Sequence, residues 1–93
     1  MPKIKNEINK NYSSELIQLA KKTIWFQEYE ETLANRDQFL AYLMKNGRIN
    51  DILIMYKYYS NLDLIHAFHS DFGRIIDYKA KAFWALRLDL ELS

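Results

Sequence analysis

The chain contains no cysteine, one proline and two glycines among its 93 residues. The absence of cysteine excludes disulfide bonds, thiolate metal sites and cysteine nucleophiles. Few proline and glycine residues interrupt the chain, so helices joined by short turns are the simplest arrangement. No apolar run approaches the roughly 18–20 residues of a membrane-spanning helix, and the polar N-terminus lacks the apolar segment of a secretory signal. We therefore expect a cytoplasmic protein that has no membrane partner.

The residues that are present describe one small globular domain. The chain is 49% hydrophobic, 15% aromatic and 27% charged, which differs from collagen-like and disordered sequences. Its formal net charge of +1 gives no overall attraction to nucleic acid or to an anionic membrane. We expect residues 1–12 to form a flexible basic arm and residues 13–93 to form a single helical domain.

Cap residues and apolar spacing predict an all-α fold, a small bundle of about four or five short helices. Ser13 or Ser14 is suited to cap a first helix over residues 15–22, since serine accepts hydrogen bonds from the first backbone N–H groups of a helix. The aromatic and acidic stretch over residues 23–33 is interpreted as a loop or a short helix.

Two helices are predicted in the middle of the chain. Asn35 is suited to cap the first of them, and Gly47 ends it, where we expect the left-handed conformation that glycine adopts readily. The second helix begins at Asn50 or Asp51 and continues to Tyr59. It is apolar around nearly its whole circumference, which is typical of a helix in the middle of a bundle.

The C-terminal third contains two further cap signals and a turn. Ser60 followed by Asp63 resembles a capping box, and Asp77 is suited to cap a last helix that begins at Tyr78. Between these helices, Gly73 is placed to supply a positive φ if the turn over residues 71–74 needs one.

The last helix is predicted to bury one face against the bundle. We expect Trp84 and Leu88 on a flank, and three residues facing inward: Ala82, Phe83 and Leu86. From residue 86 to residue 92 leucines alternate with charged residues, and this period of two favours a strand or an extended C-terminal tail.

No group of residues has the spacing that an enzyme requires. His66 and His69 are three positions apart with Asp63 one turn earlier, a pattern that could hold a metal but that is more often formed by ordinary surface histidines. The serines are interpreted as caps, turn residues or the terminus, and neither glycine belongs to a phosphate-binding loop. We predict a non-enzymatic protein without catalytic residues, cofactor or metal.

An aromatic segment flanked by acids is the candidate binding site for another protein, because apolar bulk within a polar rim is typical of interfaces. Packing in the core of this domain is the alternative interpretation. The residues concerned are Trp25, Phe26 and Tyr29, with Glu28, Glu30 and Glu31 beside them.

The two mid-chain helices and the turn at Gly47 also allow a helix-turn-helix that reads DNA. The simpler interpretation of this segment is an αα-hairpin packed in the core, since the second helix offers few polar side chains to base edges. The residues that would contact DNA are Arg36, Lys45, Arg48, Asn50 and Lys57.

Several features occur in order from residue 24 to residue 90. They are the aromatic pair Trp25-Phe26, an apolar helix ending in glycine over residues 39–47, an acidic helix start over 50–52, a tyrosine-rich end over 58–60, and an aromatic helix over 82–86. Through these features the chain resembles a family of small helical bacterial proteins, whose members are often encoded beside AbiEii-like nucleotidyltransferase toxins and are suspected antitoxins. The family's pair is usually Phe-Trp followed by an acid, whereas Gln27 follows the pair here.

The resemblance implies an antitoxin that neutralises a nucleotidyltransferase-type toxin by protein–protein binding, and it transfers no catalytic residue. The alternative from the residues themselves is a small DNA-binding regulator, whose affinity for DNA would fall steeply with salt.

Overall fold

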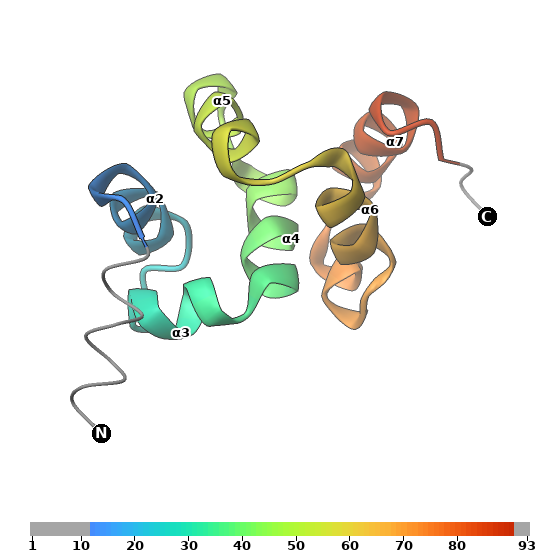
Figure 1. Cartoon of the computed structure of the whole chain (residues 1–93). Coiled ribbons are helices and arrows are strands. Elements are labelled where there is room, and N and C mark those ends of the chain that lie inside the picture. Colours follow the sequence, from blue (N-terminus) through green and yellow to red (C-terminus); the bar gives the residue numbers. More distant parts are fainter. Residues whose placement is uncertain (1–11, 91–93) are drawn as a thin grey trace.

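The computed structural model describes residues 12–90, which form six α-helices and one 3₁₀ helix (Figure 1). The elements are α2 (Ser14–Thr23), α3 (Tyr29–Ala34), α4 (Arg36–Asn46), α5 (Ile49–Tyr58), α6 (Asn61–His69), η1 (Asp71–Ile75) and α7 (Tyr78–Arg87). This confirms the predicted all-α class; the number of helices exceeds the prediction because the stretch over residues 23–33 includes a helix of its own. Apart from Tyr12, the predicted N-terminal arm lies outside the described residues.

Three of the predicted caps are formed as the sequence indicates. The Ser13 hydroxyl accepts a hydrogen bond from the Leu16 backbone N–H at 3.1 Å. The Ser60 hydroxyl accepts from the Asp63 N–H at 3.3 Å, and the Asp63 carboxylate accepts from the Ser60 N–H at 2.9 Å. Asp77 accepts from the Ala80 N–H at 2.9 Å. Each of these side chains satisfies a helix N–H that has no partner within its own helix, which fixes where the helix begins.

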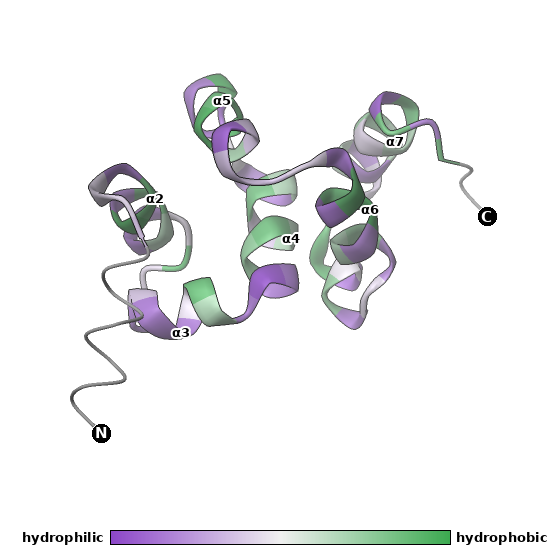
Figure 2. Ribbon diagram, in the orientation of Figure 1, coloured by the Kyte–Doolittle hydropathy of each residue, from purple (hydrophilic) through white to green (hydrophobic). Residues whose placement is uncertain are grey.

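Helix α4 is the centre of the molecule. Figure 1 shows it between α2 and α3 on one side and α6 and α7 on the other, and all four of these helices pack against it. Its fully or nearly fully buried residues are Phe39, Leu40, Ala41, Leu43 and Met44. Figure 2 shows this hydrophobic part of α4 enclosed by its neighbours, with the hydrophilic first turn at one end.

Helix α5 is helical as predicted, but the prediction that it lies in the middle of the bundle is wrong. It packs chiefly against α2, and it buries only Asp51 and Met55. Ile49 is 79% exposed and Leu53 is 61% exposed. The central position is already filled by α4, so a ten-residue helix that contacts mainly α2 can cover only one of its faces. The α4–α5 segment is accordingly not a closely packed αα-hairpin.

Helix α7 buries the face opposite to the predicted one. Trp84 and Leu88 are 3% and 6% exposed, whereas Phe83 and Leu86 are 57% and 83% exposed. The indole N–H of Trp84 donates a buried hydrogen bond to the Met44 carbonyl oxygen at 3.0 Å. Because tryptophan has the largest apolar area on this helix and an N–H that needs a partner, its burial sets the helix rotation.

Neither glycine adopts a positive φ: the expected left-handed conformation of Gly47 is wrong, and the turn at Gly73 does not need one. Gly47 has φ −66°, and a Cβ built on it would lie 2.5 Å from the Leu43 carbonyl oxygen. A Cβ on Gly73 would clash with the Phe68 carbonyl oxygen. Both positions therefore suit glycine because the backbone passes close to a preceding helix end. Within residues 12–90, Asp89 alone among non-glycine residues has a positive φ, of 59°.

The predicted strand or extended tail after residue 86 is wrong at its start. Leu86 and Arg87 continue α7, and the chain turns at Asp89 so that the Leu90 N–H donates to the Ala85 carbonyl oxygen at 2.7 Å. Residues 91–93 lie outside the described part of the chain. Over residues 12–90, no helix combines the length and apolar character needed to cross a bilayer.

Candidate functional site

The loop between α2 and α3 exposes two of the three aromatic residues predicted to bind a partner. Trp25 is 80% exposed and Phe26 is 55% exposed. Their rings meet edge to face at 5.7 Å between centroids, and Phe26 meets Tyr42 of α4 in the same way at 6.0 Å. We call Trp25, Phe26 and Tyr42 the aromatic surface. Such edge-to-face contacts favour particular relative orientations of the rings.

Side-chain hydrogen bonds fix this loop to the two helices that follow it. The side-chain amide of Gln27 donates to the Thr32 hydroxyl at 2.9 Å and to the Gln38 side-chain oxygen at 3.1 Å. Thr32, which is fully buried, donates in turn to the Glu28 carbonyl oxygen at 3.3 Å. The loop is thus tied to both α3 and α4, and a surface held in one conformation loses less entropy when it binds.

Tyr29, the third predicted aromatic residue, is not part of this surface. It is half-buried, packs against the core, and has the Lys21 ammonium 5.5 Å from its ring centroid. Burial and then the nearby charge of Glu30 raise the pKa of the Tyr29 hydroxyl. The ring therefore anchors α3 to the domain, and Phe26 has Tyr42 rather than Tyr29 as its second aromatic neighbour.

The three predicted acids lie at the start of α3, directly after the aromatic loop. Glu28 occupies the N-cap position, and Glu30 and Glu31 are in the first turn. Carboxylates are stabilised there by the unpaired N–H groups and the positive end of the helix dipole. Glu28 and Glu31 are exposed, so the region beside the aromatic pair is negatively charged and open to a partner.

A small cavity of about 220 Å³ lies next to Trp25, with Tyr42 on its wall. It is also lined by Lys22 and Asp51, whose side chains form an ion pair at 2.7 Å. Burial alone would raise the pKa of Asp51, but the Lys22 ammonium and the Arg48 backbone N–H outweigh it and lower that pKa. The Asp51 carboxylate is 8% exposed and already satisfied, so it joins α2 to α5 and leaves the neighbouring aromatic residues as the binding features.

The five residues of the predicted DNA-binding surface are not equivalent in the structure. Arg36 pairs with Asp63 at 3.0 Å, and Lys57 pairs with Glu15 at 3.0 Å. The other three, Lys45, Arg48 and Asn50, are exposed. Two of the four cations are thus engaged by acids of this chain: Arg36, one of the three predicted phosphate contacts, and Lys57, which was predicted to face the bases.

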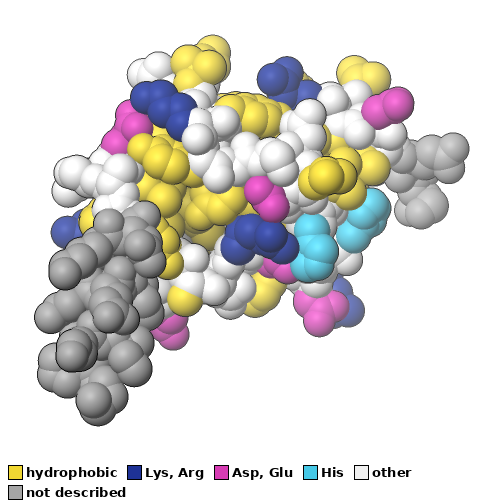
Figure 3. Space-filling model, viewed as in Figure 1, with side chains coloured by type: hydrophobic (Ala, Val, Ile, Leu, Met, Phe, Trp, Pro, Cys, Tyr) yellow, Lys and Arg dark blue, Asp and Glu magenta, His cyan; other side chains and the backbone are white. Residues whose placement is uncertain are grey.

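The two histidines have different surroundings and are not arranged as a ligand pair. Nδ1 of His66 lies 3.0 Å from the Asp37 carboxylate and 3.2 Å from Nη2 of Arg36. The His69 ring packs edge to face on Phe68 at 5.4 Å. Figure 3 shows both histidines on the surface beside basic and acidic side chains. Over residues 12–90, no three histidine, cysteine or acidic side chains are placed to hold a metal ion.

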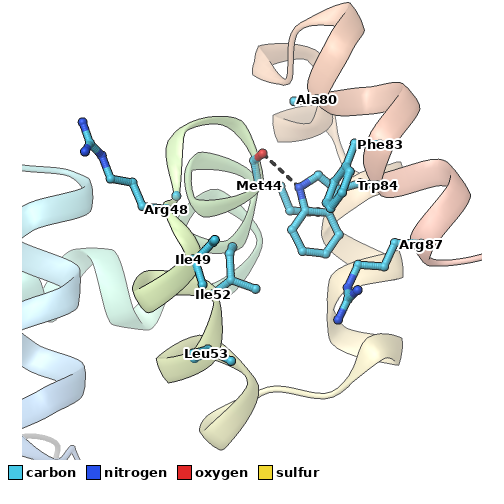
Figure 4. Close-up of a pocket in the computed structure, with 10 residues that line it drawn as sticks. Met44, Arg48, Ile49, Ile52, Leu53, Ala80, Phe83, Trp84 and Arg87 are labelled. Carbon is cyan, nitrogen blue, oxygen red and sulfur yellow. Dashed lines mark hydrogen bonds between the residues drawn. The ribbon is translucent and has the colours of Figure 1, made fainter.

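A second surface was missed by the sequence predictions, which placed the mid-chain helix in the middle of the bundle and Phe83 facing inward. It is an apolar cavity of about 370 Å³ between α5 and α7, and we call it the α5–α7 groove (Figure 4). Ile49, Ile52 and Leu53 line one wall and Phe83 lines the other, with the buried Trp84 at the floor. The signal in the sequence was the spacing of the three α5 residues at i, i+3 and i+4, which marks a helix face but not the neighbour that covers it.

Compared with protein-family models, with curated proteins and with solved structures, the chain matches none. The family resemblance therefore stays a prediction, and the function is inferred from the geometry of these surfaces.

Proposed function

We propose that this chain is a non-enzymatic protein-binding domain that docks on its partner through the aromatic surface. The observation that carries the proposal is the 80% exposure of Trp25 on a loop that Gln27 holds in place. A tryptophan side chain that leaves water on binding removes a large apolar area from solvent, and tryptophan is enriched among the residues that dominate interface energies.

The charge beside the aromatic surface indicates the kind of partner. Glu28 and Glu31 are exposed at the rim, and Trp25 and Phe26 form an apolar centre next to them. This arrangement of apolar centre and charged rim suits a partner that offers an apolar socket bordered by basic residues. Clefts that bind nucleotide phosphates contain such basic residues.

A nucleotidyltransferase-type toxin is the partner class that fits this charge and that the family resemblance implies. Docking at the basic cleft of such an enzyme would exclude its nucleotide substrate, and this chain would then act as an antitoxin without any chemistry of its own. The proposal predicts that a nucleotidyltransferase-type protein is encoded next to this chain's gene.

Co-expression with that neighbouring protein tests the proposal. We expect a stable complex and restored growth of the host. The double substitution W25A/F26A should weaken the complex by roughly 30-fold or more, the effect of losing a binding hot spot. The matched control is L62A/Y78A, because Leu62 and Tyr78 are also large and exposed, at 77% and 81%, but lie on α6 and α7.

Three results would contradict the proposal: no complex with the neighbouring gene products, equal weakening by the control, or toxicity that persists in the presence of the chain. A gel-shift titration across salt concentrations, with DNA from upstream of the gene, separates the DNA-binding alternative. Tight and salt-dependent binding there, abolished by R48A, would favour a regulator instead.

A further inference from the structure

Within residues 12–90, no helix covers the α5–α7 groove. Its floor is the C-terminal end of α4, where Met44 and Gly47 lie, and α5 and α7 form its walls (Figure 4). The two wall helices are not closely packed against each other. An apolar floor between two flanking helices is a site into which an amphipathic helix can pack.

The apolar side chains of the groove remain open to solvent. Ile49 is 79% exposed, Leu53 is 61% exposed and Phe83 is 57% exposed. Beneath them Trp84 is held by its hydrogen bond to the Met44 carbonyl, so the floor is fixed before anything binds. Contiguous exposed apolar surface of this kind on a small domain marks a site of association.

The charged residues of the groove all have one sign. Arg48 borders it at the start of α5, where its side chain extends away from α7 (Figure 4), Arg87 borders it at the end of α7, and none of its described lining residues is acidic. The Arg87 guanidinium lies 5.4 Å from the Tyr56 ring centroid, and its Nε donates to the Tyr56 hydroxyl at 3.3 Å. The nearest acid along α5, Asp51, is bound to Lys22 and lines the other cavity.

We infer that the α5–α7 groove binds an amphipathic helix of a partner protein, with apolar anchors on one face and carboxylates along its flanks. The apolar anchors would cover Leu53 and Phe83, and the carboxylates would pair with Arg48 and Arg87. This site is separate from the aromatic surface and prefers the opposite charge, so it provides the domain with a second partner or with a second contact to the same one.

Charge also decides against two other occupants. A second copy of this chain seated symmetrically on the groove would bring its own Arg48 and Arg87 to the same apolar face, and would supply no acid from that face. Residues 1–11 of this chain carry three lysines against Glu7 alone, which is the wrong sign for a groove with two arginines.

The full chain can be titrated with two synthetic peptides of about 18 residues, long enough to form a helix on binding. Both carry leucine on one face; one has glutamate along the flanks and the other has lysine. Calorimetry gives the affinities, and the indole N–H resonance of Trp84, compared with that of Trp25, reports where the peptide binds. We expect the glutamate peptide to bind roughly tenfold more tightly than the lysine peptide and to shift Trp84 but not Trp25.

Substitutions then locate the site. L53S should weaken the glutamate peptide by roughly tenfold, because one leucine burial is lost. The matched control L62S alters another exposed leucine, on α6, and should leave the affinity unchanged. The double variant R48E/R87E should reverse the preference, so that the lysine peptide binds more tightly. I49S serves in place of L53S if circular dichroism shows that the latter is unfolded.

Equal binding of both peptides would overturn the inference, since it would indicate nonspecific apolar binding that does not depend on the charge of the peptide. Equal weakening by L53S and L62S, or a shift of Trp25 instead of Trp84, would also overturn it. So would a dimer in sedimentation that L53S abolishes and L62S retains, because the occupant would then be a second copy.

Discussion

The aromatic surface and the α5–α7 groove both leave large apolar side chains exposed, but they achieve this by different means. On the loop, a network of side-chain hydrogen bonds through Gln27 and Thr32 holds Trp25 and Phe26 outward. In the groove, no other described element covers the facing sides of α5 and α7. The first surface is bordered by glutamates and the second by arginines.

The comparison shows that two different structural causes can keep large apolar side chains exposed to solvent. A loop residue stays exposed when polar bonds beneath it are satisfied, because refolding the loop inward would break them. A helix residue stays exposed when the rest of its helix is already committed to other contacts, as Met55 and Asp51 commit α5 to the rest of the domain. Since the two causes are independent, a substitution confined to one surface should damage that surface and leave the other intact.

Removing the floor of the groove should have the largest effect on stability. We expect W84A to lower the free energy of unfolding by about 3–5 kcal/mol, the usual cost of truncating a buried tryptophan. Phe83, its neighbour on the wall, is 57% exposed, and F83A should cost less than about 1 kcal/mol. Urea denaturation followed by circular dichroism measures both. Similar losses for the two variants would mean that α7 does not present the faces described above.

Gly47 lines both cavities, so G47A should affect both surfaces. The added Cβ would lie 2.5 Å from the Leu43 carbonyl oxygen and 3.1 Å from Cδ1 of Ile52, and we expect a loss of about 1–3 kcal/mol from the forced displacement. Thermal unfolding measures this loss. A gain in stability would show that the helix end yields without strain, because alanine restricts the unfolded chain more than glycine does.

The ion pair between Lys22 and Asp51 joins the part of the domain that bears the aromatic loop to the part that bears the groove. D51N should lower the free energy of unfolding by about 1–2 kcal/mol at neutral pH. Because folding lowers the Asp51 pKa, its contribution is present above the ordinary aspartate value and is lost as pH falls below about 4. The difference between wild type and D51N should therefore shrink in acid, as urea titrations at several pH values would show. A difference that is constant across pH would contradict this assignment.

The brace of the aromatic loop should have the smallest effect on stability. Q27E replaces a donor to Thr32 and Gln38 with a carboxylate beside Glu28, and we expect a loss of about 1 kcal/mol. The fluorescence anisotropy of Trp25, measured in a W84F background, should fall as the loop loosens. The single variant Q27E, which keeps Trp84, should retain peptide binding in the groove. Q18E is the control, because Gln18 is exposed on α2. No change in anisotropy would show that the aromatic contacts alone hold the loop.

The sequence predicted the helix starts well because capping is local. Ser13, Ser60 and Asp77 cap the helices that follow them, and each cap involves residues only three positions apart. The same local reasoning failed for the glycines at 47 and 73. What matters at those positions is a carbonyl from the end of the preceding helix, whose closeness depends on the path of the whole turn.

The candidate surfaces were predicted only in part. The aromatic pair and its acids could be predicted as a binding site because polar and acidic residues directly follow the two aromatic residues in the sequence. The groove was not visible, because Ile49, Leu53 and Phe83 have the same spacing whether a neighbour covers them or not. Tyr29 lies in the same short segment as the aromatic pair, yet it faces the core.

The amino-acid sequence by itself determined that this chain is helical, and also where most of its helices begin, because these depend on hydrogen bonds and periodicities within a few residues. The tertiary structure decided which face of each helix meets solvent. That choice depends on which helix occupies the centre and on single long-range contacts such as that of Trp84 with Met44, which lie 40 residues apart in the chain. As a result, apolar residues of the kind that usually form a core line a groove at the surface of this protein.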